Sequence, residues 1–165
     1  MIIPWDDEES FEFPLATKRG RLIPNIRKPE YSPEKARDFI EFHERNFGIL
    51  QRRSISRTYN CVGMVFANRR VSVEPEHVQT FLDEDGYRQI VESEARQGDV
   101  IVYRNTMSNE IVHVGVLMSP IVDDADWLVL SKWGPGGEYL HRKRQTHPTY
   151  LEYVEFEYWT ERIDI

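Results

Sequence analysis

Cys61 is the single cysteine of the 165-residue chain, and the stretch YNCVGMVFANRR around it predicts a short apolar helix that begins near this residue. A thiol becomes a nucleophile when its thiolate is stabilised, as the unpaired N–H groups at a helix N-terminus can do. A histidine must then accept and return the proton. His113 begins the apolar run HVGVLM of an expected strand. The two residues therefore predict thiol-based acyl chemistry.

Both residues also have a plain structural explanation. A free cysteine is commonly a small buried hydrophobe. A histidine at the end of a strand commonly binds backbone groups. Gly63, directly after the start of the expected helix, and the strand GDVIVY that precedes the His113 strand favour the functional interpretation.

Three motifs carry a resemblance to known enzymes. NCVGMVFA resembles the nucleophile motif of NlpC-type enzymes, and QGDVIVY followed by HVGVLM resembles their second signature. WLVLSKWGPGGEY is similar to the strand of papain-like peptidases that ends in a Trp-Gly pair. Together the motifs span residues 59–139, about half the chain, in the order cysteine, histidine, polar residue. The resemblance implies the NlpC-type, papain-like superfamily of cysteine peptidases and amidases.

This resemblance implies specific roles for the matching residues. Cys61 is the expected nucleophile, and His113 is the expected general base and later general acid. The backbone N–H of Cys61 would help to hold the oxyanion, a contribution on the order of 3 kcal/mol where such donors have been removed in other enzymes. Tyr59 matches a tyrosine beside the NlpC-type site and is expected to bind the substrate or the oxyanion.

The third catalytic residue departs from the family pattern. Papain-like enzymes carry asparagine where this chain has Ser131, and NlpC-type enzymes use a histidine or an amide on this strand, whereas His141 follows ten residues later. Either side chain is expected to orient the imidazole. Lys132 is expected to face a substrate carboxylate, with Trp133 beside it. Asn60 replaces the more usual aspartate and is also assigned to the substrate site, where the lost negative charge should favour the thiolate.

Composition limits the partners that we expect. Lys and Arg number 21 against 28 Asp and Glu, giving a net charge of -7, which disfavours nucleic acid and anionic membranes as partners. We expect no metal or cofactor. His43 and His77 have no partner at metal-ligand spacing, and no cysteine or acidic motif completes a zinc set with His141 and His147. The segment MIIPWDDEES has neither the basic nor the apolar region of a signal peptide, so we expect a cytoplasmic protein, although export without a signal stays open.

The first half of the chain carries helix signals. SPEKARDFIEFHERNFG has the capping Ser32, proline at the first helical position and Gly48 after the last turn. We expect His43 on the exposed edge of this helix. VEPEHVQTFLDEDG predicts another short helix. The apolar face of the first helix consists of Ala36, Phe39, Ile40 and Phe47.

The second half predicts strands in DVIVYRN, IVHVGVLMS, DWLVLSKWG and YLEYVEFEYW. We therefore expect an α+β, papain-like (NlpC-type) fold in which N-terminal helices pack on a C-terminal antiparallel sheet. Residues 1–31, interrupted by four prolines, are expected to form an extended arm across a single domain of residues 32–165.

These observations predict a cysteine hydrolase that cleaves a peptide, isopeptide or related acyl amide bond through an acyl-thioenzyme. One alternative is a catalytically inactive papain-like domain that binds a protein partner as an inhibitor, immunity or assembly protein. Another is a toxin-type deamidase or acyltransferase. The sequence leaves the substrate and the oligomeric state open.

Overall fold

The structure, a computed structural model, describes residues 10–47, 51–121, 126–134, 136–146, 150–151 and 153–163. The elements in chain order are α1 (Pro33–Phe47), β1 (Gln51–Ile55), α2 (Cys61–Phe66), α3 (Val78–Glu84), β2 (Arg88–Ile90), β3 (Val100–Asn105), β4 (Ile111–Ile121), β5 (Asp126–Lys132), β6 (Gly137–Arg142) and β7 (Val154–Thr160). Short 3₁₀ turns cover Pro75–His77, Glu92–Glu94 and Lys143–Gln145. The predicted mixture of helices and strands is confirmed.

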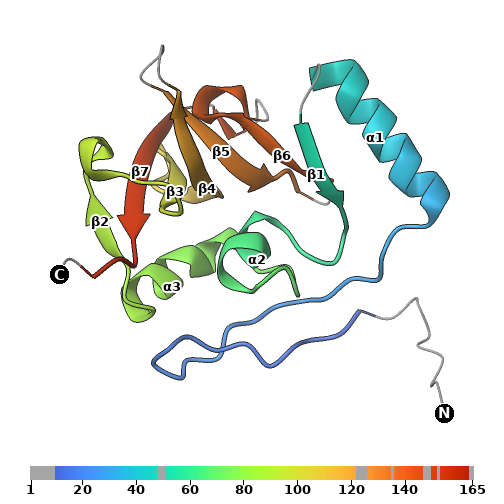
Figure 1. Cartoon of the computed structure of the whole chain (residues 1–165). Helices are drawn as coiled ribbons and strands as arrows, with labels where there is room; N and C mark the ends of the chain where they lie inside the picture. The colour runs from blue at the N-terminus through green and yellow to red at the C-terminus, as the bar shows by residue number, and fades with distance from the viewer. Residues whose placement is uncertain are drawn as a thin grey trace.

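All strands join one antiparallel sheet in the order β1-β6-β5-β4-β3-β7-β2. β3, β4, β5 and β6 follow one another as neighbours, while β7 returns to the far side of β3 (Figure 1). The predicted packing of helices on an antiparallel sheet is confirmed, with α2 and α3 lying together on one side of it (Figure 1).

Side chains of successive strand residues point to opposite faces, so the sheet carries two apolar layers. The first core, on the side of α2 and α3, consists of Ile23, Cys61, Val62, Ala67, Val71, Val73, Val78, Phe81, Leu82, Val100, Val102, Ile111 and Val114. The second core, on the opposite face, consists of Ile90, Ile101, Tyr103, Leu117, Trp127, Val129 and Tyr158. Burial of each large apolar side chain contributes roughly 1.5–3 kcal/mol, so both layers stabilise the sheet.

A β-bulge at the start of β4 changes this alternation locally. The register with β3 shifts between Tyr103, which pairs with His113, and Arg104, which pairs with Ile111. Because of the extra residue, Ile111 and Val114 both reach the first core. His113 lies on the second face, opposite Tyr103.

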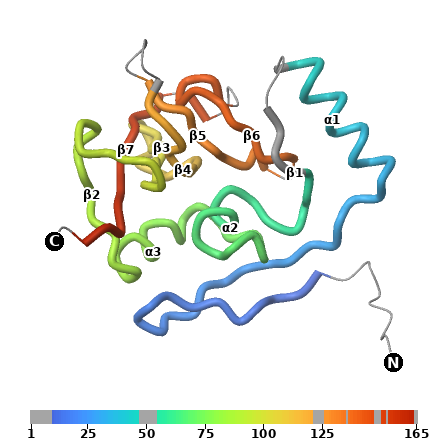
Figure 2. The backbone as a smooth tube through the Cα atoms, in the orientation of Figure 1, coloured from blue at the N-terminus to red at the C-terminus, as the bar shows by residue number. Residues whose placement is uncertain are grey.

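Residues 10–31 run extended along the outer side of α2 and α3 (Figure 2). Isolated bridges pair Phe11 with Arg27, Ala16 with Leu22 and Ile26 with Ser72. Ile23 is 3% exposed and belongs to the first core. This segment therefore contributes to the core as well as lying across the surface. The division at residue 31 stays a prediction.

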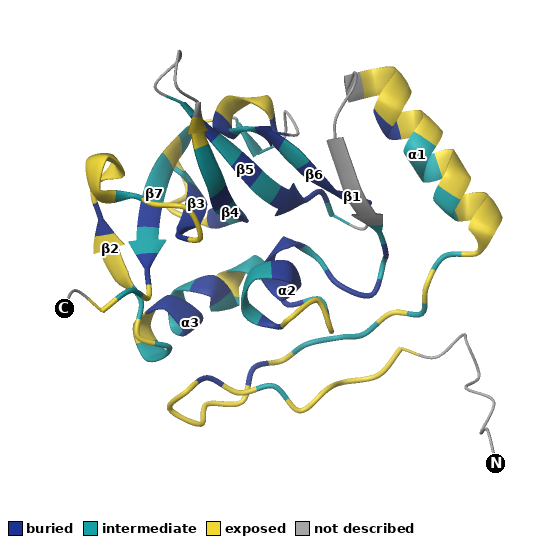
Figure 3. Ribbon diagram, in the orientation of Figure 1, coloured by how far each residue is buried: buried dark blue, intermediate teal, exposed yellow. Residues whose placement is uncertain are grey.

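The helix α1 is the most exposed of the three helices (Figure 3). Ser32 caps it as predicted, since its hydroxyl accepts the Lys35 N–H at 3.3 Å. The prediction that His43 lies on the exposed edge is wrong. Its ring is buried against Tyr139 and Trp133, at centroid distances of 5.5 and 6.2 Å. Gly48 and the Phe47 side chain lie outside the described residues.

Gly63 allows α2 to approach its neighbours closely. A Cβ atom at this position would lie 1.7 Å from the Val71 backbone oxygen. We expect Gly63→Ala to lower the free energy of unfolding by more than about 3 kcal/mol, because a backbone oxygen has little room to move. Urea unfolding measures this change. The control is Gly20→Ala, which has open space and a positive φ and should lose only roughly 1–2 kcal/mol. Equal losses in both variants would contradict this packing.

Candidate active site

Asn60 fixes the start of α2, and with it the position of Cys61. Its side-chain oxygen accepts the N–H groups of Gly63 and Val73 at 3.0 and 3.2 Å. Its amide nitrogen donates to the Val73 carbonyl at 2.7 Å. The helix therefore begins at Cys61, as predicted. Asn60 serves as a helix cap here, which corrects its assignment to the substrate site.

Cys61 is buried, with 5% of its surface exposed. Burial raises the pKa of this thiol from 9.0 to about 11, although hydrogen bonds from backbone N–H groups, led by that of Val114, act in the opposite direction. The nearby charge of Lys132 also lowers this pKa. Val114 directly follows His113, so the sulfur lies beside β4 at the backbone of the predicted catalytic histidine.

His113 is fully buried between two tyrosine rings. Tyr150 stacks on its imidazole with ring centroids 4.2 Å apart, and Tyr103 meets it edge-on at 5.1 Å. Burial, followed by the charge of Cys61, raises the pKa of Tyr150 to about 12. Tyr150 is therefore close to both Cys61 and His113. The sequence reading missed this tyrosine, because it lies outside every recognised motif.

Strand alternation places the His113 imidazole on the opposite face of the sheet from the Cys61 thiol. Cys61 packs in the first core with Val114, whereas His113 lies on the face of Tyr103. The sulfur therefore approaches β4 at its backbone, where it accepts the Val114 N–H. A direct bond between the Cys61 sulfur and the His113 ring stays a prediction.

Ser131 and His141, the two candidates for the third catalytic residue, bind each other. The Ser131 hydroxyl lies 2.7 Å from Nε2 of His141, and Nδ1 of His141 lies 2.7 Å from the Arg142 carbonyl oxygen. A carbonyl only accepts, so Nδ1 carries the proton and Nε2 accepts the Ser131 hydrogen. Both ring nitrogens of His141 are thus occupied, which corrects its proposed contact with the His113 imidazole.

Ser131 keeps oxygen lone pairs after this bond. It lies on β5 beside Gly115, since a Cβ atom on that glycine would be 3.2 Å from the Ser131 Cβ. Gly115 and His113 point to the same face of β4. Ser131 therefore offers a hydrogen-bond acceptor on the same face of the sheet as His113. Its role in orienting His113 stays a prediction.

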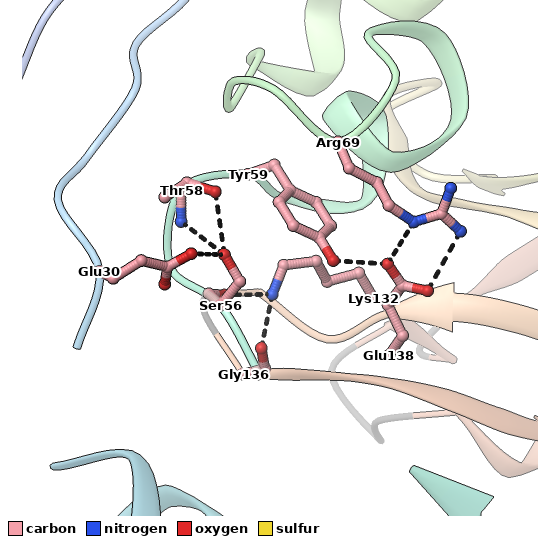
Figure 4. Close-up of polar contacts among 8 residues, drawn as sticks. All are labelled: Glu30, Ser56, Thr58, Tyr59, Arg69, Lys132, Gly136 and Glu138. Atoms are coloured by element: carbon pink, nitrogen blue, oxygen red, sulfur yellow. Dashed lines mark hydrogen bonds and ion pairs between the residues drawn. The ribbon is translucent and has the colours of Figure 1, made fainter. Parts of the chain in front are cut away.

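Lys132 lies on the α2 side of the sheet and is fully buried. Its ammonium donates to the Ser56 and Gly136 carbonyls at 2.6 and 2.5 Å and lies 4.7 Å from the centre of the Tyr59 ring (Figure 4). Burial lowers the pKa of Lys132 to about 8, while the charge of Glu138 opposes this shift. The predicted contact of Lys132 with a substrate carboxylate is corrected, because its donors are used inside the fold.

Tyr59 and Arg69 converge on Glu138 in the same network (Figure 4). The Tyr59 hydroxyl donates to the Glu138 carboxylate at 2.5 Å, and Arg69 binds the same carboxylate through two nitrogens at 2.6 and 3.2 Å. Burial raises the pKa of Glu138, but the hydrogen bonds from Arg69 and Tyr59 outweigh burial and leave it lowered. Tyr59 is therefore structural, which corrects its predicted contact with substrate or oxyanion.

Trp133 also belongs to the interior and not to the substrate site. It is 3% exposed, and its ring packs against Tyr139 and His141 at 4.7 and 5.6 Å. Sequence reasoning also missed Glu138 and Arg69. Glu138 lies in the GGEY segment, but the sequence does not indicate which residues surround its carboxylate.

A groove of about 530 Å³ opens next to Tyr150. Its lining residues come from the 3₁₀ turn before α3, from α3 itself, and from the turn and strand ends of β3 and β4. They are Glu74, Pro75, Glu76, Gln79, Arg104, Asn109, Glu110, Ile111, Val112 and Tyr150. The groove lies in the size range of small-ligand sites, about 300–1,000 Å³, and reaches the tyrosine that covers His113.

No protein-family model, curated protein or solved structure matches the chain. Across the described ranges, no group of three or more His, Cys, Asp or Glu side chains is arranged to hold a metal ion. Within that same part of the chain, no helix combines the length and apolar character needed to cross a membrane. The proposed activity therefore depends on the geometry of the site.

The buried His141 predicts a pH-dependent loss of stability. Burial lowers the pKa of this ring from 6.5 to about 4, so the folded state binds fewer protons than the unfolded state between these values. Stability should fall as pH decreases from 6.5 to 4, by roughly 3 kcal/mol in total. Urea unfolding at several pH values measures this loss.

The matched variants are His141→Gln and Ser131→Ala. The first removes the titrating ring and should flatten the stability profile in this pH range. The second keeps the buried ring and should retain the acid loss. An unchanged profile in His141→Gln would contradict the assignment.

Proposed function

We propose that the chain is a papain-like cysteine hydrolase that cleaves an amide bond through Cys61 and His113. The observation that supports this most strongly is the position of the Cys61 sulfur beside β4, where the backbone N–H of Val114, the residue after His113, lowers the pKa of the thiol. The start of α2 at Cys61 and the stacking of Tyr150 on His113 add to this support.

In the proposed reaction, Cys61 gives its proton to His113 as the sulfur attacks the substrate carbonyl carbon. The carbon–nitrogen bond then breaks, and His113 protonates the leaving amine. His113 next takes a proton from water, whose oxygen attacks the thioester and releases the acid and the thiol. The proposal requires Ser131 to accept an N–H of His113 and so to hold the ring in place. The backbone N–H of Cys61 stabilises the oxyanion.

A second candidate is a protein-binding domain that has this fold without the chemistry. The observations that favour it are the burial of Cys61 and the pKa of about 11 of its thiol, which leaves almost no thiolate in the resting protein at neutral pH. For the hydrolase to work, proton transfer to His113 must offset the unfavourable ionisation of the buried thiol during the reaction. The two candidates therefore differ in whether His113 changes the reactivity of Cys61.

Acyl transfer from p-nitrophenyl acetate distinguishes these candidates. For a hydrolase we expect an acetyl group on Cys61 in the mass spectrum and continued release of p-nitrophenolate. Cys61→Ala should abolish both, and His113→Gln should lower the rate at least about 100-fold, because general acid–base catalysis is lost. Glu41→Gln on the exposed face of α1 is the control, and its rate should be unchanged.

The opposite result is equally clear. If wild type and His113→Gln are acetylated at the same slow rate, and that rate rises only as the pH approaches about 11, the thiol acts alone. The hydrolase proposal would then be rejected in favour of the binding domain. Circular dichroism of each variant confirms that the fold is retained.

A further inference from the structure

The groove beside Tyr150 has an acidic rim. Glu74, Glu76 and Glu110 are exposed and belong to its lining. Glu76 also makes a 3.7 Å contact with His77, while its own side chain is 79% exposed. Exposed carboxylates on a concave surface can turn toward a bound cation at little cost. The rim therefore offers three negative charges to a ligand.

Arg104 does not neutralise this rim, because its positive charge is paired with Glu157 in the wall of the groove. Its guanidinium binds both oxygens of Glu157, at 2.5 and 3.3 Å. Its remaining N–H groups donate to the Asn109 carbonyl and to the Gln79 side chain, each at 3.0 Å. Arg104 is the one basic side chain among the described lining residues. Its bonds join β3, β7, α3 and the β3–β4 turn into a fixed wall.

The floor of the groove is apolar. Ile111 is buried, and Val112 and Tyr150 are half-buried, so each leaves part of its surface for a ligand. Burial raises the pKa of Tyr150 to about 12, which keeps the phenol neutral at physiological pH. A ligand that fits this groove combines an apolar group for the floor with a positive charge for the rim.

We propose that this groove binds a polypeptide segment in which a lysine or arginine is adjacent to an apolar residue. This inference rests on the proposed hydrolase function, and it assigns the substrate class to the same site. Tyr150 joins the two regions, because it lines the groove and stacks on His113. The bound segment would therefore lie beside Tyr150, the ring that stacks on His113.

Charge and size favour a polypeptide segment as the occupant. The net charge of -7 attracts cationic partners over long distances, and the three carboxylates concentrate that field at the groove. A volume of about 530 Å³ has room for an apolar side chain beside a basic one. A small polyamine would meet the rim but would leave the apolar floor unfilled.

Peptide selection on the Cys61→Ala variant tests the inference without cleavage of the ligand. A display library of random peptides is selected on this protein, and the enriched peptides are synthesised for affinity measurements by fluorescence anisotropy. We expect them to carry lysine or arginine next to an apolar residue and to bind more weakly as salt is raised. Spermidine at equal ionic strength should compete poorly, because it lacks an apolar group.

Two charge-matched variants locate the binding site. The groove variant combines Glu74→Gln, Glu76→Gln and Glu110→Gln. The control variant combines Asp38→Asn, Glu41→Gln and Glu44→Gln on the exposed face of α1, and it removes the same amount of charge. The groove variant should weaken peptide binding at least about tenfold, and the control less than about twofold.

Three results would overturn the inference: no enriched peptide, enriched peptides without basic residues, or equal affinity for the groove and control variants. Its failure is separable from failure of the hydrolase proposal. If peptides bind in the groove and the wild type does not cleave them or transfer acyl groups, the groove assignment stands and the hydrolase fails. If Cys61 turns over the ester but selection finds no basic peptide, the hydrolase proposal stands and the groove assignment fails.

Discussion

The alternation of side chains between the two faces of the sheet decides which groups can meet at Cys61. The α2 face brings Lys132 and Val114 to the sulfur, whereas His113 and Ser131 lie on the second face. The bulge at the start of β4 shifts the register with β3 beside His113. The backbone N–H of the next residue, Val114, lies near the sulfur and lowers the pKa of the thiol.

A buried polar network holds α2 in this position. The Lys132 ammonium joins the Ser56 carbonyl, before α2, to the Gly136 carbonyl, before β6. Glu138 adds a second link through Tyr59 and Arg69, on the two sides of α2. A buried charge stabilises the fold only when it is paired and hydrogen-bonded. Removing one residue of this network would leave the remaining charges buried without a partner, which destabilises the folded state. Lys132 and Tyr59, which were predicted to bind substrate, thus help to determine where Cys61 lies.

The sequence predicted the element types, the start of α2 and the antiparallel strands, because N-cap residues, glycines and β-branched runs act locally. The functions of individual polar residues were harder to predict. Tyr59, Asn60 and Lys132 stand in the motifs that resemble the site of a known family. In the folded chain they instead bond to Glu138, Val73 and Gly136, respectively. Nothing in the sequence identifies these three as their partners. Tyr150 lies in no motif, and only the folded chain places it on His113.

In the proposed hydrolase, Cys61 and His113 act together on one amide bond of the substrate. A crystal structure of the protein treated with a peptide aldehyde that carries arginine next to leucine tests it most directly. We expect a covalent bond from the Cys61 sulfur to the aldehyde carbon, with a ring nitrogen of His113 within about 4 Å of that sulfur. An unmodified thiol, or a modified one with the His113 ring still directed into the second core, would show that Cys61 and His113 do not act as a catalytic pair.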